Sequence, residues 1–160
     1  MAEMFLKLTG VDGESKAAGH ENEIDVLAWS WGMTQPGSMG MGGGGGTGRV
    51  SIQDISITKY IDKASAQLML FCCNGQHIDE GTLVCRKAAG GSALEFLKIK
   101  LTKVFVTSVS TGGTPGEEQL SENVTLSCAK FEVEYQEQQE DGSGQVAGNM
   151  AWNVKQNVAA

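Results

Sequence analysis

Hydrophobic and polar residues alternate along much of this chain, which is the pattern of half-buried β-strands. The stretches that show it are residues 4–8, 24–31, 50–60, 83–87, 96–101, 124–128, 131–135 and 150–154. The apolar residues change phase at Val104, and again before Phe131. Strands shift phase in this way where they bend to serve two walls of a barrel. We therefore expect a mainly β fold, a compact β-barrel of two packed antiparallel sheets.

One short helix interrupts the strands. Asp62 or Ser65 can cap it, and Leu68, Phe71 and Cys72 have the spacing of one helical face. The pair 74–75, Asn-Gly, is typical of a helix end. The sequence thus predicts an α+β protein with a single helix flanking the barrel.

The predicted strand at 24–31 has one bulky and one small face. Trp29 and Trp31 alternate with Ala28 and Ser30, so each pair lies on its own side. Tryptophan side chains need burial, and we therefore expect them to face the barrel interior. The small face, with Ala28 and Ser30, would then lie on the outside of the barrel.

Most residues between Gly37 and Gly48 are glycine. Gly43, Gly45 and Gly48 match the letters of a dinucleotide-binding motif, but Val50 then opens a strand where that motif requires a helix, so we expect no nucleotide. Ordering such a loop costs on the order of 10 kcal/mol. The loop is therefore either a floppy hairpin tip or a segment that settles on a neighbouring surface, and its methionines favour the second interpretation.

Two other segments have loop composition. Residues 110–118 are acidic and rich in turn formers, and residues 136–144 are polar and acidic, so we expect a tail-like loop there.

The chain has 160 residues, 41% hydrophobic and 19% charged, which fits one globular domain over residues 1–160. Its net charge is −7 and its cations are scattered, so a nucleic-acid partner is disfavoured. Residues 1–7 do not resemble a signal peptide, and no stretch has transmembrane length. We expect synthesis in the cytoplasm and no membrane insertion.

Candidate reaction chemistry is sparse. His20 with Glu21 and Glu23 could be imagined as a metal site, but a solvated loop is the commoner explanation. Cys73 would sit at a helix C-terminus, where the dipole raises a thiol pKa, so pairing with His77 does not suggest a nucleophile. We expect no enzymatic activity, no catalytic residue, no metal and no cofactor. The four cysteines lack metal spacing and are expected to be buried free thiols.

Several segments resemble one family, the haemolysin-coregulated proteins (Hcp), which form the tube of bacterial type VI secretion. They are residues 23–33, the glycine run 42–46, and residues 58–65, 109–113 and 122–126. The similarity extends in order from Met4 to Val158. Ala66 stands where the family would have a proline at the first helical turn, which should leave a cap at Ser65 intact.

This resemblance implies a homo-hexameric ring, rings stacked into a tube, and export with type VI spike and sheath components to the extracellular space or a target cell. It also implies carriage of small effector proteins in the lumen. For the inter-subunit or inter-ring loop we select Met33, Met39, Gly40, Met41, Gly42, Gly43, Gly44, Gly45 and Gly46. For the lumen wall we select Ala28 and Ser30. The alternative is a monomeric ligand-binding β-barrel with the glycine loop as a lid.

Overall fold

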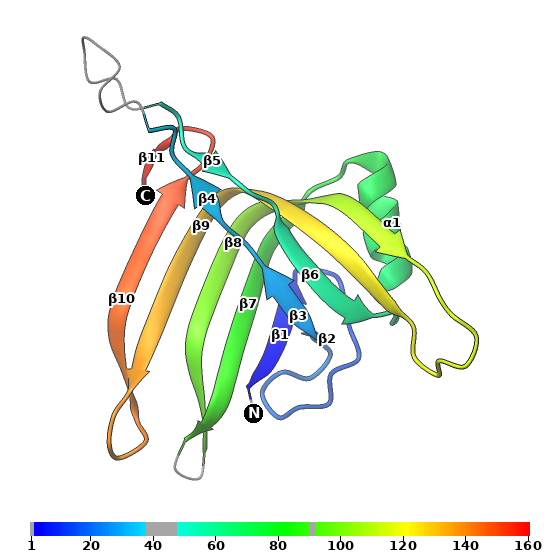
Figure 1. Ribbon diagram of the computed structural model, residues 1–160, viewed down its shortest axis with the longest axis horizontal. Coiled ribbons are helices and arrows are strands. Elements are labelled where there is room, and N and C mark those ends of the chain that lie inside the picture. The colour runs from blue at the N-terminus through cyan, green and yellow to red at the C-terminus, as the bar shows by residue number, and fades with distance from the viewer. Residues whose placement is uncertain (1, 38–47, 90–91) are drawn as a thin grey trace.

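The structure is a computed structural model that describes residues 2–37, 48–89 and 92–160 (Figure 1). Over these residues the chain forms one helix and eleven strands. The elements before the helix are β1 (Glu3–Leu8), β2 (Ile24–Asp25), β3 (Ala28–Ser30), β4 (Met33–Thr34), β5 (Ser51–Ile52) and β6 (Ile55–Tyr60). The helix is α1 (Ser65–Asn74), and after it come β7 (Ile78–Ala89), β8 (Ser92–Thr111), β9 (Ser121–Gln138), β10 (Gly144–Asn153) and β11 (Val158–Ala159).

The long strands β8 and β9 organise the main antiparallel sheet. On one side of this pair the strand order is β7, β1 and β2. On its other side β9 has two neighbours, because its first half pairs with β6 and its second half pairs with β10. β11 pairs with the end of β10, and β3 pairs with β6.

One short segment bridges the two edges of this curved sheet. β2 pairs with β1, β3 pairs with β6, and only Val26 and Leu27 separate β2 from β3. The Val26 amide donates to the Met4 carbonyl (3.0 Å), and the Leu27 amide donates to the Thr58 carbonyl (2.8 Å). β2 and β3 do not pair with each other, so the sheet is not one closed hydrogen-bonded cylinder among the described residues. The chain at Val26 and Leu27 connects its two edges. The second sheet is the two-stranded β4–β5 ladder. A mainly β fold with two antiparallel sheets and one helix is confirmed.

Both predicted phase shifts are present in the burial pattern. Leu101 and Val104 are both buried, and between them Lys103 has a φ of 56°, in the left-handed region. Leu126 and Phe131 are likewise both buried on β9. Because of these bends, one half of β8 and of β9 forms part of the barrel wall, and the other half extends beyond the barrel.

The helix ends where the sequence predicted, but neither of the two predicted capping residues occupies its N-cap position. Ser65 is the first helical residue rather than the cap, and Ala64 occupies the cap position without a side-chain bond. The Asp62 carboxylate accepts from the Ala64 amide (2.9 Å), and Gly75 ends the helix in the left-handed conformation at φ 70°. No helix of the described residues is long and apolar enough to cross a membrane.

Three expected element boundaries were wrong. The predicted strand at 24–31 is split into β2 and β3 by the crossing from β1 to β6, and the predicted strand at 50–60 is split into β5 and β6. The expected tail-like loop at 136–144 instead joins two strands, with the turn at 139–143. The end of β9 and the start of β10 were missed because their side chains are polar and mostly exposed on both faces of the sheet.

A single core fills the described barrel. Its fully buried members include Leu6, Ile24, Ile57, Leu68 and Val104, so it joins both walls and α1. Trp29 and Trp31 are half-buried and pack against it, as expected. A ligand-binding barrel would need this interior space for its ligand.

Candidate assembly surfaces

The outer part of the main sheet, which we call the arm, consists of β10 with the adjoining halves of β8 and β9 (Figure 1). Register places apolar neighbours on one face of the arm: Leu97, Ile99, Phe131, Val133, Tyr135, Met150 and Trp152. It places polar neighbours on the other face: Lys98, Lys100, Glu132, Glu134 and Asn149. The apolar face begins at buried Phe131 and continues to Tyr135 and Met150, which are 43% and 44% exposed.

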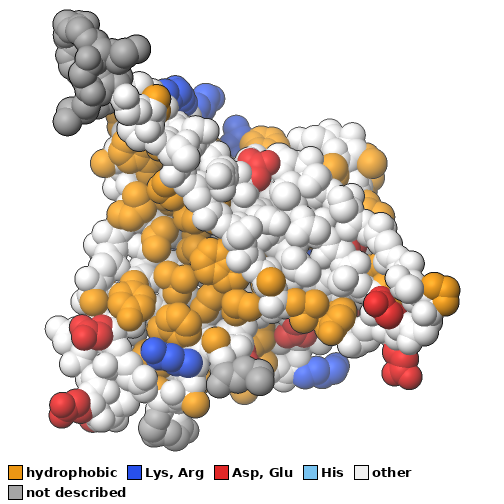
Figure 2. Space-filling view, viewed as in Figure 1, with side chains coloured by type: hydrophobic (Ala, Val, Ile, Leu, Met, Phe, Trp, Pro, Cys, Tyr) orange, Lys and Arg blue, Asp and Glu red, His pale blue; other side chains and the backbone are white. Residues whose placement is uncertain are grey.

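Figure 2 shows hydrophobic side chains gathered over β8, β9 and β10, on the face turned to the viewer. Where the arm approaches the β4–β5 ladder, this face is hollowed into a groove of about 300 Å³. Its apolar lining includes Met33, Ile52, Phe131, Met150 and Trp152. A contiguous exposed apolar face of this kind marks an interaction surface.

A second surface lies near the end of β6. Leu27 and Tyr60, which are 42% and 38% exposed, line an open hollow of about 570 Å³ together with Glu117 and Glu118. The glutamates come from the loop between β8 and β9, which the Leu120 carbonyl ties to the Ile61 amide (2.7 Å). This hollow combines an apolar floor with an acidic rim, and we call it the acidic hollow.

The structure places only part of the predicted loop. Met33 is exposed on β4, opposite Ile52, and it lines the groove beside the arm. The other selected loop residues, Met39 to Gly46, lie outside the described residues. Ala28 and Ser30 are exposed on β3 opposite Thr58 and Ser56, so their side chains are available to a lumen but their role stays a prediction.

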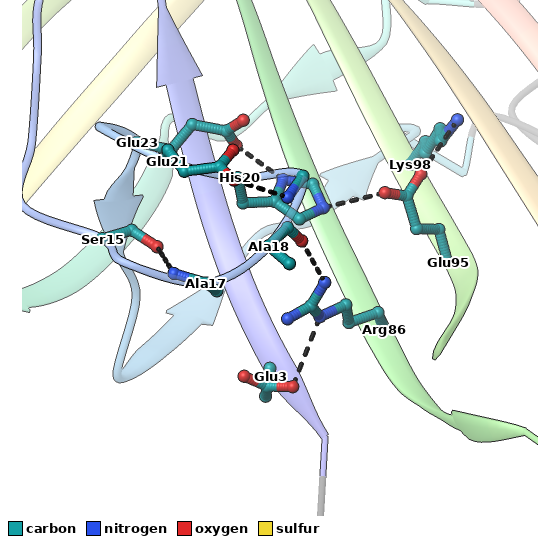
Figure 3. Close-up of polar contacts among 11 residues, drawn as sticks. Glu3, Ser15, Ala17, Ala18, His20, Glu21, Glu23, Arg86, Glu95 and Lys98 are labelled. Atoms are coloured by element: carbon teal, nitrogen blue, oxygen red, sulfur yellow. Dashed lines mark hydrogen bonds and ion pairs between the residues drawn. The ribbon is translucent and has the colours of Figure 1, made fainter. Parts of the chain in front are cut away.

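His20 is buried, and the expectation of a solvated loop was wrong. Its ring stacks on Phe5 with centroids 4.4 Å apart and planes 5° apart. Nδ1 lies 2.9 Å from a Glu23 oxygen, and Nε2 lies 2.8 Å from a Glu95 oxygen (Figure 3). Each ring nitrogen thus lies within hydrogen-bonding distance of a carboxylate, and the ring is clamped between the two carboxylates.

The neighbours of this clamp fix the loop of residues 12–23 to the sheet. Arg86 donates to the Ala18 carbonyl (3.0 Å) and lies over the Phe5 ring, 4.9 Å from its centroid. Burial raises the pKa of Glu95, but the hydrogen bonds from Lys98 and His20 outweigh it, so the pKa of Glu95 is lowered. Local sequence placed only Glu23 near His20, because Phe5, Arg86 and Glu95 lie on three separate strands.

Replacing His20 with alanine should free this loop. Each charge-assisted bond contributes about 1.5–3 kcal/mol, so we expect trypsin to cut after exposed Lys16 at least about tenfold faster than in the wild type. The matched control is His77→Ala, because His77 is half-exposed and its 3.4 Å contact with Asp79 is solvated. Equal cleavage in the two variants would contradict the clamp.

A buried charge cluster joins α1 to the sheet. The Lys59 ammonium is fully buried and donates to Glu122, to Asp62 (2.9 Å) and to the Ser65 hydroxyl (3.3 Å). The Ser65 hydroxyl also donates to Glu122 (2.6 Å). Lys59 is the penultimate residue of β6, Glu122 is the second residue of β9 and Ser65 begins α1, so the cluster fixes the position of the helix.

The four thiols are free, and they differ in burial. Cys85 is buried and Cys72 and Cys128 are half-buried, but Cys73 is exposed, contrary to the expectation of four buried thiols. Burial raises the pKa of Cys128 to about 11 and also raises that of Cys85. Within residues 2–37, 48–89 and 92–160 no group of three His, Cys, Asp or Glu side chains is arranged to hold a metal ion, and this includes His20 with its glutamates.

Residues 5–135 match the family model described as "Type VI secretion system effector, Hcp". The chain is 53% identical to "Protein hcp1" of Pseudomonas aeruginosa over 161 aligned positions, which cover 99% of this chain and 98% of that protein.

Solved structures give the same result. The Hcp1 crystal structure from Salmonella typhimurium is 35% identical, with a TM-score of 0.79 and 99% of each chain covered. A structure described as that of a type six secretion system protein is 28% identical, with a TM-score of 0.90 and full coverage of both chains. A type VI secretion system effector from Yersinia pestis is 33% identical, with a TM-score of 0.76, covering 94% of this chain and 99% of that one.

Proposed function

The chain belongs to the Hcp family of type VI secretion proteins, and from this premise we propose that it is the structural subunit of the exported inner tube. In this proposal subunits close into hexameric rings, and the rings stack into a tube that carries small effectors in its lumen. The subunit is made in the cytoplasm and leaves through the type VI apparatus, in contact with the spike and the sheath. Its role is mechanical, with no reaction of its own.

The observation that supports assembly most directly is the apolar face of the arm. Tyr135 and Met150 are more than two-fifths exposed on a face that continues the core. Burying apolar surface contributes about 25 cal/mol per Å², so an isolated subunit forgoes stabilisation that a neighbour would supply. The opposite face of the arm, with Lys98 and Glu134 in register, suits water.

Purified protein should therefore form annular particles. Light scattering during size-exclusion chromatography should give the mass of six subunits, and negative-stain imaging should show rings. A particle that stays monomeric at high concentration would contradict the tube role and would favour the ligand-binding barrel instead.

Deleting residues 39–46 should abolish secretion while leaving the fold intact. The loop departs from the β4–β5 ladder at the rim of the barrel, so a shorter hairpin can still connect the same two strands. Secreted protein is measured by immunoblot of the culture medium, and the fold by thermal denaturation. A companion variant replaces Met39 and Met41 with serine, which keeps the length of the loop and should also reduce secretion if these methionines make the contact. Normal rings and normal secretion after the deletion would reject a role for the loop in assembly.

Replacing Ser30 with arginine should reduce the amount of effector that copurifies with the rings. Ser30 is exposed on β3, so the larger side chain can be accommodated without disturbing the core. The conservative control is Ala28→Ser, which keeps the wall small. If effector content is the same in rings of both variants, Ala28 and Ser30 do not line the lumen.

A further inference from the structure

We propose that, in the proposed ring on which this inference rests, the apolar face of the arm of one copy docks against the acidic hollow of the next copy. In this contact Lys87 of the first copy faces Glu117 and Glu118 of the second. The occupant of each surface is thus a second copy of this chain, and the two surfaces are different parts of the molecule.

A cation on the neighbouring strand β7 lies at the border of the apolar face of the arm. Lys87 lies on β7 opposite Leu94, and its Nζ is 4.9 Å from the centroid of the Phe96 ring. Among the described side chains no carboxylate lies within ion-pair distance of Lys87. This ammonium is held against the Phe96 ring, next to Leu97 in the sequence, with its charge unpaired among the described side chains.

The acidic hollow offers the complementary chemistry. Leu27 and Tyr60 supply an exposed apolar floor, and Glu117 and Glu118 supply two carboxylates at its rim. Within the described part of the chain neither carboxylate has an ion-pair partner. An apolar face with one cation thus has a counterpart in an apolar hollow with two anions.

The positions of the two surfaces favour a closed ring. β10 and its neighbours lie on the left in Figure 1, whereas the end of β6 and the loop that follows β8 lie on the right. A contact between two different surfaces at opposite ends of a subunit is heterologous, and its repetition generates a ring when the rotation closes. A contact of either surface with itself would stop at a dimer.

Buried apolar area supplies most of the free energy in such an interface, and charge pairs at its rim set the choice of partner and the register. We expect Lys87→Glu to raise the protein concentration for half-assembly about tenfold, because it places like charges opposite each other. Glu118→Lys should have a similar effect. The double variant Lys87→Glu with Glu118→Lys should assemble at a concentration close to that of the wild type.

Light scattering over a dilution series measures this concentration, and thermal denaturation of the dilute protein checks the fold. The control is Lys16→Glu, which changes the net charge equally at an exposed position outside both surfaces. Half-assembly of Lys87→Glu at the wild-type concentration would overturn the contact, and so would a double variant no better than the single ones. Rings of the wild type would persist in either case, which separates this failure from failure of the tube role.

A zero-length carbodiimide crosslink tests the same pairing without substitutions. Lys87 and Glu117 or Glu118 should be joined in peptides from the ring fraction, and the products should include chains linked as dimers, trimers and larger species. Dilute monomer should lack this link, because Lys87 pairs with Leu94 near the start of the 20-residue strand β8, whereas Glu117 and Glu118 follow the far end of that strand. Ring-fraction peptides that link Lys87 only to other carboxylates would overturn the proposal.

Discussion

Replacing Lys59 with methionine should lower the free energy of unfolding by about 3–5 kcal/mol, since it removes one partner of a buried ion pair. Glu122 is 3% exposed and would be left with only the Ser65 hydroxyl as a donor. The start of α1 would also lose the ammonium that holds Asp62 and Ser65. Chemical denaturation of the dilute protein measures the loss.

Two further variants separate the buried cluster from charge effects in general. Lys98→Met removes a cation whose side chain is 43% exposed and pairs with Glu95, so its cost should stay below about 1 kcal/mol. Lys59→Met combined with Glu122→Leu should recover a large part of the lost stability, because no buried charge is left unpaired. If Lys59→Met costs no more than Lys98→Met, the cluster does not stabilise the fold.

Phe131→Ala should destabilise the subunit by about 3–5 kcal/mol, because it opens a cavity where the arm leaves the barrel. Phe131 is 1% exposed, and its ring meets the edge of Trp31 at a centroid distance of 4.7 Å. It also lies opposite Leu101 and Trp152 in the sheet. The loss should appear as a lower denaturation midpoint of the monomer.

Tyr135→Ala is the matched comparison on the same strand and the same face. Tyr135 is 43% exposed in the isolated subunit, so its truncation should cost less than about 1 kcal/mol of monomer stability. In the ring its side chain should be covered, so the same variant should assemble several-fold more weakly. A variant that loses monomer stability but assembles normally would place Tyr135 outside the interface.

The sequence predicted elements whose apolar residues alternate against a core. β1, β6 and the helix end at Gly75 follow directly from such local patterns. β10 was found only at its end, near Trp152, because Gly144 to Met150 are exposed in the single subunit. Alternation of hydrophobic and polar residues indicates burial within one chain. A hairpin whose residues are exposed in the single chain lacks this alternation and is missed.

The polar clusters could not be predicted from local patterns. Lys59 and Glu122 belong to two of the segments that carry the family resemblance, yet only the antiparallel pairing of β6 and β9 places them side by side. His20 was taken for a loop residue because its partners Phe5 and Glu95 lie on distant strands. The two proposed contact surfaces likewise combine residues that only the tertiary fold brings together.

The last long strand has a consequence for strand pairing between single copies. β10 pairs with β9 on one side, and on the other side β11 covers it only at Trp152 and Asn153. A flat uncovered strand of this length would template fibre growth, but a bulge between Val146 and Gly148 breaks its regular spacing. The uncovered edge of a single copy is therefore a poor template for strand pairing with another copy.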